Sequence, residues 1–331
     1  KRTAVDQAVE RLLGSDIVGF STYCWNIELS LSIARRLREI QPETLIVFGG
    51  PQVPDHAEPF LRTHRFIDIV CHGEGERTFL EILEGYSSRD WSATPSVSYL
   101  LSDGGFVHQT KGNRIADLST IPSPYLDGVF TRLIAANPHE RWHVLWETNR
   151  GCPFSCTFCD WGSAIASKVY QFDMDRLRAE IDWFADQEIE FLFCCDANFG
   201  ILPRDLEIAE YVLETRERGG FPVGIGVQNT KNATERAYRV QKMLAPMSRN
   251  GVTISLQSTH PQTLKSVKRD NISTDSYREL QQRYTRDGIE TYTDMILSLP
   301  GETYETWANG IAEVIENGQY NRIQFYNCFI L

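Results

Sequence analysis

The chain has 331 residues, of which 42% are hydrophobic, and its formal net charge is −11. That length is enough for two domains with buried cores, and the acidic balance argues against nucleic acid or an anionic membrane as the main partner. No apolar run of about 18 residues predicts a membrane span, and no signal peptide is visible. The eight cysteines lack the spacing of a disulfide scaffold, which favours a reducing, cytoplasmic setting.

Strands and helices alternate over residues 1–90. Short apolar runs predict buried strands, and apolar residues at helical spacing predict helices between them. The strands are expected at 16–21, 44–48 and 67–71, and the helices at 27–40, at 55–63 and before Gly85. This alternation predicts an α/β fold with a Rossmann-like, doubly wound parallel sheet. Ligands of such sheets bind outside the carboxyl ends of the strands, which here are 21–26, 49–51 and 72–76.

Residues 91–143 are predicted to be a linker that docks the first domain on the second. The linker contains a hairpin signal, because Asp103-Gly104-Gly105 lies between two apolar runs. A connecting segment that contains two prolines follows at 121–125. His108, His139 and His143 have no partner at metal-ligand spacing, so no chemistry is assigned to them.

The stretch from Gly151 to Trp161 contains Cys152, Cys156 and Cys159 in a C-x3-C-x2-C spacing. Glycine and proline within it disfavour a regular helix, so a loop can bring the three thiolates together. Three ligands are too few for a structural zinc site, which takes four. They are enough to hold three irons of a 4Fe-4S cluster and leave the fourth iron open to a small molecule. The alternatives are a zinc knuckle or a chance group of cysteines.

Beyond residue 144, strands alternate with helices again, with strands expected at 144–148, 189–195, 223–227, 252–256, 289–297 and 322–331. The helix after the third of these strands is expected at 233–249. The alternation is too short for a closed eightfold barrel and predicts an open, partial (β/α)6 barrel over residues 144–331. Barrels of this kind place their chemistry at the C-terminal ends of the strands. The cysteine loop follows the first strand, and polar residues follow the later ones: Asp196, Asn198, Gln228, Asn229, Gln257, Ser258 and the loop 300–303. Because the chain begins without Met and stops inside an apolar run, we expect both domains to continue beyond it.

The cysteine spacing, with the aromatic Phe158 before the last cysteine, is similar to the signature of the radical S-adenosylmethionine (SAM) enzymes. The longer run E-T-N-R-G-C-P-F-S-C-T-F-C-D-W-G resembles, more specifically, members that carry a cobalamin (B12) domain in front. The resemblance implies that SAM chelates the open iron of the cluster and is cleaved to a 5′-deoxyadenosyl radical after reduction. It also implies that residues 1–90 bind cobalamin.

Several roles follow from this resemblance, position by position. Phe158 and Pro300 are expected beside the adenine of SAM, and Arg269 could pair with its carboxylate. The remaining SAM contacts are expected from Asp196, Gln228, Gln257 and Ser258. The alternatives are ordinary: Asp196 could cap a turn, Arg269 could be a surface charge, and Pro300 could be loop packing.

The cobalamin contacts are expected at the carboxyl edge of the first sheet. Ser21 and Gly49-Gly50 occupy the places that line the nucleotide tail in the family, where glycine lets the backbone approach a bulky ligand. A D-x-H-x-x-G motif is absent from the chain, so another side chain would meet the lower face of cobalt, with Trp25 first. Trp25 could instead be a packing aromatic, and the whole domain could bind nothing. The full set is Ser21, Thr22, Tyr23, Trp25, Asn26, Gly49, Gly50, Pro51, Gly73 and Glu74.

The resemblance implies a radical methyltransferase that uses methylcobalamin to methylate a carbon of a small, antibiotic-type natural-product intermediate. A flavodoxin- or ferredoxin-type protein would supply electrons. Two alternatives keep the cofactors but change the reaction, namely a rearrangement or cyclisation, and polar methyl transfer. A third is a sensor module that couples redox state to a partner.

Overall fold

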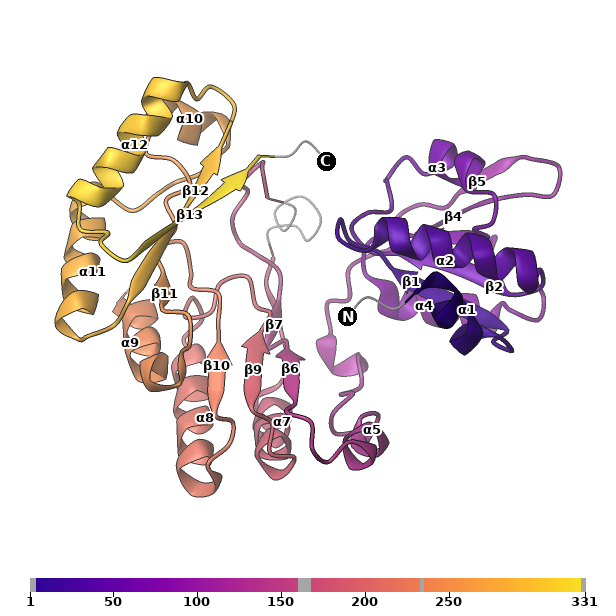
Figure 1. The fold of residues 1–331 in the computed structure, drawn as a ribbon, viewed down its shortest axis with the longest axis horizontal. Coiled ribbons are helices and arrows are strands. Elements are labelled where there is room, and N and C mark those ends of the chain that lie inside the picture. Colours follow the sequence, from indigo (N-terminus) through magenta and orange to yellow (C-terminus); the bar gives the residue numbers. More distant parts are fainter. Residues whose placement is uncertain (1–3, 160–167, 233–234, 329–331) are drawn as a thin grey trace. The chain divides into compact units, whose positions relative to one another are not determined.

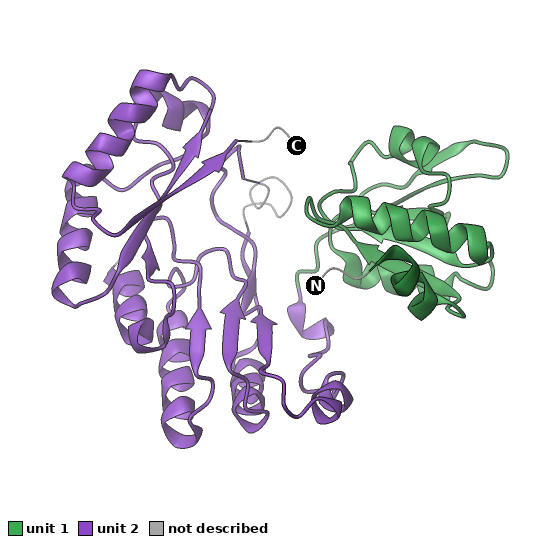
Figure 2. Ribbon diagram, in the orientation of Figure 1, with its two compact units in different colours: residues 1–116 green, residues 117–331 purple. Residues whose placement is uncertain are grey.

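The computed structural model describes residues 4–159, 168–232 and 235–328. They form two compact units, residues 1–116 and 117–331, and Figures 1 and 2 show the elements of each. Both units are α/β, as predicted. Among the described residues, no helix has the length and apolar character that a membrane crossing requires.

The first unit contains a five-stranded sheet in the order β1-β2-β3-β4-β5. Its parallel strands are β1 (Ile17–Ser21), β2 (Leu45–Gly49) and β3 (Ile69–Cys71). The helices of this unit are α1 (Val5–Leu12), α2 (Ile27–Ile40), α3 (Glu58–Thr63) and α4 (Gly75–Glu84). The register pairs Ser21 with Gly49, so the carboxyl ends of β1 and β2 lie side by side.

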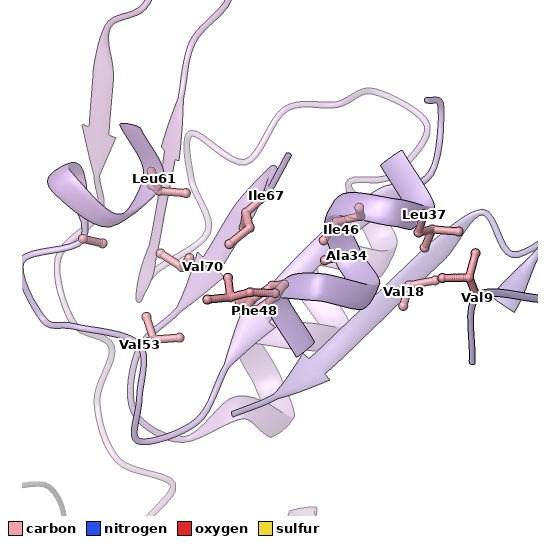
Figure 3. Packing of buried hydrophobic residues seen from close by; sticks show 12 residues of the cluster. Val9, Val18, Ala34, Leu37, Ile46, Phe48, Val53, Leu61, Ile67 and Val70 are labelled. Carbon is pink, nitrogen blue, oxygen red and sulfur yellow. The ribbon is translucent and has the colours of Figure 1, made fainter. Parts of the chain in front are cut away.

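Both faces of this sheet are buried, which explains why its strands are continuous apolar runs. On one face, Ile46 and Phe48 pack with Ala34 and Leu37 of α2 (Figure 3). The opposite face buries residues of β2 and β3 against Ile82 of α4 in a separate cluster. Each fully buried Leu, Ile or Phe contributes roughly 1.5–3 kcal/mol. The doubly wound core predicted from the sequence is confirmed.

The predicted hairpin is present, but it lies in the sheet and not in a linker. It consists of β4 (Val97–Leu100) and β5 (Phe106–His108), which pair antiparallel. β4 also pairs antiparallel with β3, and its Val97 and Tyr99 are buried in the core. The physical reason is that β3 would otherwise expose an unpaired edge. The first unit therefore extends to Ala116, and not to residue 90.

The second unit is built from six parallel strands in two groups, β10-β9-β6 and β11-β12-β13. Their bounds are β6 (His143–Trp146), β9 (Phe191–Cys194), β10 (Gly224–Gly226), β11 (Val252–Thr253), β12 (Thr291–Leu297) and β13 (Arg322–Asn327). The principal helices between them are α7 (Met174–Asp186), α8 (Asp205–Gly219), α9 (Glu235–Leu244), α11 (Thr274–Arg286) and α12 (Tyr304–Glu316). This is the predicted partial barrel, seen with its strands and flanking helices in Figure 1.

The strands at the middle of the barrel are shorter than predicted. β10 has three residues and contains Gly224 and Gly226, which contribute no side chain to pack. β11 has two residues, and the chain reaches a left-handed conformation at Gln257, with φ +66°. Asn229 joins the two groups of strands, because its Nδ2 donates to the carbonyl of Thr253 at 3.0 Å.

Shorter elements complete the unit. They are η1 (Leu118–Thr120), α5 (Thr131–Ala136), β7 (Asn149–Arg150), β8 (Tyr170–Gln171), η2 (Ala245–Met247) and α10 (Pro261–Ser266). Parts of the predicted helix at 233–249 and of the last predicted strand, at 233–234 and 329–331, lie outside the described residues.

Glu180 of α7 joins the segment that precedes the barrel to the first barrel strand. Its carboxylate accepts from Ser123 Oγ at 2.6 Å, Trp146 Nε1 at 2.8 Å and Arg176 Nε at 2.9 Å. Only 2% of its surface is exposed. A buried carboxylate is tolerated when it is paired and hydrogen-bonded, as this one is.

We therefore expect Glu180→Ala to lower the free energy of unfolding, because it leaves the buried donors of Ser123 and Trp146 without their acceptor and removes an ion-pair partner of the half-buried Arg176. Each buried donor left without an acceptor costs about 1–3 kcal/mol. Urea denaturation of the purified chain measures this effect. Glu210→Ala, at an exposed position of α8, is the matched control and should unfold near the wild-type midpoint. Equal midpoints for the two variants would contradict the role assigned to Glu180.

Candidate functional site

The cysteine loop begins where a short ladder holds the backbone. β7 pairs antiparallel with β8, so the chain leaves at Arg150 and returns at Tyr170. Gly151 has φ +122°, and a Cβ there would lie 2.2 Å from the carbonyl oxygen of Lys168. Only glycine fits such a contact. The loop is also tied to the end of α10, because Thr157 N donates to the carbonyl of Val267 at 3.0 Å.

Asp196, which follows β9, joins that strand to the start of the cysteine loop. Its carboxylate accepts from the backbone N–H groups of Thr148 and Asn149 at 2.8 and 3.1 Å. It also accepts from Thr148 Oγ1 and, at 2.7 Å, from Asn149 Nδ2. Four donors occupy this carboxylate, so its role in the described structure is to position the loop. The predicted SAM contact remains a hypothesis.

Two of the three cysteines are buried and the third is half-buried. Asn198 Nδ2 donates to Cys152 Sγ at 3.2 Å, and Lys231 Nζ donates to Cys156 Sγ at 2.7 Å. Arg269 also lies close enough to Cys156 and Cys159 for their thiols to act on its pKa. Three thiols on one loop, surrounded by hydrogen-bond donors and cations, suit an anionic cluster of iron and sulfide.

Among the described residues, no three His, Cys, Asp or Glu side chains converge closely enough to hold one metal ion. A cluster does not require this, because each of its irons takes its own thiolate. Asp160 and Trp161, the end of the predicted motif, lie outside the described residues.

Arg269 is not a surface charge, which was the alternative to its predicted role. It is 6% exposed, and burial lowers the pKa of its guanidinium. The guanidinium donates to neutral acceptors: the carbonyls of Ser255 and Leu256, and Asn271 Oδ1. With Ser155 of the cysteine loop it also lines a pocket of about 660 Å³. A buried cation held mainly by carbonyl oxygens beside the cysteine loop fits an anionic ligand such as the carboxylate of SAM.

Gln257 and Ser258 lie together after β11. Gln257 pairs with β12 through its backbone, and its buried Oε1 has no hydrogen-bond partner within the described ranges of the chain. Ser258 donates through Oγ to Glu302 Oε1 at 2.6 Å, while Glu302 Oε2 is also buried without a partner. Buried polar atoms without partners are uncommon in native structures. Two unoccupied acceptors here fit the hydroxyl or amino donors of a bound ligand.

The remaining predicted SAM residues fall into two groups. Phe158 packs against an apolar cluster of Val267, Ile296 and Leu299, which gives the loop an apolar side suited to an adenine ring. Pro300 is adjacent to this cluster in sequence but exposed. Gln228 is exposed as well, and its carbonyl accepts from Phe199 N at 2.7 Å. Phe158, Leu299 and Arg269 therefore all lie near the end of α10. Gln228 lies apart from this cluster in sequence, just after the end of β10.

The carboxyl edge of the first sheet has an open surface. Trp25 is 71% exposed and stacks on Tyr23 with ring centroids 4.6 Å apart. Asn26 holds this turn, because its Nδ2 donates to the carbonyl of Ser21 at 2.9 Å and its Oδ1 accepts from Tyr23 N at 2.7 Å. The turn after β1 therefore exposes two stacked aromatic rings, and Asn26 shapes the turn.

The backbone conformation and packing at Gly50 require a glycine, whether or not a ligand is bound. It has φ +96°, and a Cβ would lie 2.6 Å from the carbonyl oxygen of Thr22. The buried Thr22 is held against β2, because its N and Oγ1 both donate to the carbonyl of Gly49, at 2.7 and 2.8 Å. Gly49 itself has room, with the nearest atom 3.7 Å from a built Cβ. Pro51 is exposed beside them.

The third strand end combines the predicted Gly73 and Glu74 with an unpredicted pair of histidines. Gly73 is exposed with φ +74°, and Glu74 Oε2 accepts from Ile115 N at 2.7 Å. Ser98 Oγ lies 2.8 Å from both His72 Nε2 and His108 Nδ1. No spacing rule joins residues 72 and 108, because they meet only through two antiparallel pairings, β3 with β4 and β4 with β5.

No pattern in the sequence assigns a role to Lys231. Its only signal is its position just after the polar end of β10, a place shared with many solvated lysines. Asn198 is recognisable in the sequence as a polar residue after a strand, but no local pattern relates it to Cys152.

Gly50→Ala is expected to lower the free energy of unfolding by at least about 1–3 kcal/mol, the cost of a non-glycine residue in this backbone conformation. Gly49→Ala should cost less than about 1 kcal/mol, since its neighbours are at ordinary contact distance. Chemical denaturation compares the two. If Gly50→Ala proved as stable as Gly49→Ala, the close approach to Thr22 would be wrong.

Asp196 predicts a specific dependence of stability on pH. Burial raises the pKa of Asp196 from its ordinary 3.8 to about 6. Between these values the folded chain holds a proton that the unfolded chain has lost, so the free energy of unfolding falls as pH rises from about 4 to about 6. The contribution is about 3 kcal/mol.

Urea denaturation at a series of pH values measures that contribution, and Asp196→Asn should remove it from the profile. A variant profile with the wild-type slope across this window would show that Asp196 does not titrate there.

Two family models match the chain. A model of the radical SAM superfamily matches residues 146–312, about half of the chain. A model of the B12 binding domain matches residues 2–83. These matches confirm the predicted cofactors: a 4Fe-4S cluster, SAM and cobalamin.

Two curated relatives match nearly the whole chain. The cobalamin-dependent radical SAM methyltransferase TokK of Streptomyces tokunonensis is 41% identical over 99% of this chain and 49% of its own length. A 2-(S-pantetheinyl)-carbapenam-3-carboxylate methyltransferase of Streptantibioticus cattleyicolor is 40% identical over the same shares. The chain thus spans about half the length of these relatives.

Solved structures share the fold at lower identity. TsrM of Kitasatospora setae superposes with a TM-score of 0.73 at 15% identity, covering 97% of this chain and 64% of that one. The cobalamin-dependent radical enzyme OxsB superposes with a TM-score of 0.70 at 17% identity, covering 94% and 45%. Because the model of the superfamily covers the barrel and its cysteine loop, the chain belongs to the radical SAM superfamily, with a cobalamin-binding domain preceding the barrel.

Proposed function

We propose that this protein is a cobalamin-dependent radical SAM methyltransferase that methylates a carbon of a small natural-product intermediate of the antibiotic type. The observation that carries the proposal is identity of 40–41% to two methyltransferases across both units of the chain. When bound, the cluster and SAM supply a carbon-centred radical oxidant, and cobalamin supplies a methyl carrier.

In the barrel, different residues would bind the cluster and SAM. Cys152, Cys156 and Cys159 would hold the cluster. Arg269, buried beside the loop, would pair with the carboxylate of SAM, and the apolar cluster around Phe158 would accept the adenine. Gln257 Oε1 and the Ser258–Glu302 pair would accept hydrogen bonds from SAM, which is supported by the two acceptor atoms that lack partners.

On the first unit, the carboxyl edge of the sheet would bind cobalamin. The stacked Trp25 and Tyr23 would cover one face of the macrocycle and exclude water from it, which their exposure supports. Ser21, Gly49 and Gly73 would line the approach of the rest of the cofactor. Asn26, Thr22 and Glu74 would act indirectly, because their side chains hold the surrounding turns.

The substrate class to test first is a carbapenam carboxylate, the type of compound named for one of the relatives. The electrons would come from a protein of the flavodoxin or ferredoxin type. Reduction by dithionite replaces that protein in an assay.

The deciding experiment incubates the reconstituted protein with SAM, dithionite and a carbapenam carboxylate, and measures the products by mass spectrometry. We expect a methylated product together with 5′-deoxyadenosine and S-adenosylhomocysteine. Cys156→Ala should lose the iron–sulfur absorbance and all reductive cleavage of SAM, because the loop would retain only two of its three thiolates. Cleavage that persists in Cys156→Ala would contradict the cluster assignment.

Other product patterns would replace the proposed reaction. Deoxyadenosine without S-adenosylhomocysteine would indicate a rearrangement or cyclisation. Methylated product without deoxyadenosine would indicate polar methyl transfer. Neither product, with both cofactors bound and each substrate class supplied, would favour a sensor module.

A further inference from the structure

In the described part of the barrel, two side chains that follow neighbouring strands donate hydrogen bonds to cysteine sulfurs. Asn198 follows β9 and donates to Cys152 Sγ at 3.2 Å. Lys231 follows β10 and donates to Cys156 Sγ at 2.7 Å. The strands are adjacent in the sheet, so one edge of the barrel places a donor on each of two thiolates.

Lys231 contacts the cysteine loop at a second point. Its ammonium lies 4.0 Å from the centroid of the Phe154 ring, between Cys152 and Cys156 in sequence. A cation over an aromatic face is attracted by the ring quadrupole. Two contacts on one loop hold the ammonium beside the sulfur, which distinguishes Lys231 from a lysine that extends into solvent.

We propose that Lys231, assisted by Asn198, is a positioning residue that raises the reduction potential of the cluster held by this loop. The inference rests on the assignment of Cys152, Cys156 and Cys159 to the cluster. Reduction adds one electron and therefore one negative charge to the cluster. A positive charge and hydrogen bonds at the thiolate sulfurs stabilise that added charge, and hydrogen bonds to sulfur are known determinants of cluster potentials.

Lys231 and Arg269 would then have different roles, although both lie near Cys156. Arg269 interacts with Cys156 as well, but it is buried, is held by the carbonyls of Ser255 and Leu256, and lines a pocket that can take a carboxylate ligand. Lys231 contacts the sulfur and the loop aromatic directly. Its effect should therefore appear without SAM.

The experiment is a redox titration of the cluster in the reconstituted protein, followed by electron paramagnetic resonance and without SAM. We expect Lys231→Met to lower the equilibrium constant for reduction about tenfold, a shift of about 59 mV to more negative potential for one electron. Lys231→Arg keeps the charge and should shift less. Asn198→Ala should shift in the same direction as Lys231→Met, but by a smaller amount because no charge is lost.

Lys265→Met is the matched control. Lys265 lies on α10, is exposed, lines one pocket with Ser155 of the loop, and loses the same charge on substitution. It should leave the potential unchanged. Iron and sulfide content is measured for each variant, so that only loaded protein is compared.

The outcomes separate the two assignments. A loaded Lys231→Met protein with the wild-type potential, or an equal shift in Lys265→Met, overturns the role of Lys231 and leaves the cluster assignment intact. Failure of Lys231→Met and Lys231→Arg to load, while Lys265→Met loads, would make Lys231 an assembly residue and also overturn the proposal. A cluster that still forms in Cys156→Ala would overturn the assignment on which the inference rests.

Discussion

The buried carboxylate of Asp196 fixes the position from which the cysteine loop leaves the barrel. It accepts four hydrogen bonds from Thr148 and Asn149, just before the cysteine loop begins, and it lies just after β9. The first strand and its neighbour are thereby joined at their C-terminal ends. Gly151 then turns the chain through a conformation that only glycine fits. The loop is presented at the barrel edge because its first residues are held in this way.

Near that loop, the structure buries a charged side chain and polar atoms that lack hydrogen-bond partners among the described residues. Arg269 is buried among carbonyls, and no described residue donates a hydrogen bond to Gln257 Oε1 or Glu302 Oε2. Such groups reduce stability when nothing is bound, since desolvation is not offset. They are consistent with a site whose hydrogen bonds are completed by an anionic, donor-bearing ligand. Stability is instead supplied by the apolar packing and the satisfied Glu180 network elsewhere in the unit.

In the first unit, too, contacts between neighbouring strand ends hold the turns where a ligand is expected. Its parallel strands are buried on both faces, and ligands of such sheets bind at the carboxyl ends of the strands. Thr22 and Gly50 approach so closely that the turns after β1 and β2 support one another. That contact leaves Trp25 and Tyr23 projecting from the turn as a stacked pair. A rigid base with an exposed aromatic surface is suited to a large planar ligand.

The sequence by itself determined the α/β class, the order of most strands and helices, and the cysteine loop. Hydrophobic periodicity and a local spacing carry that information, and neither depends on distant residues. The tertiary structure alone decided that the hairpin belongs to the first sheet, that His72 and His108 share Ser98, and that Arg269 is buried. It also decided that Lys231 reaches Cys156, 75 positions away. These contacts join strand ends that are distant in the chain, and only the pairing of the strands brings them together.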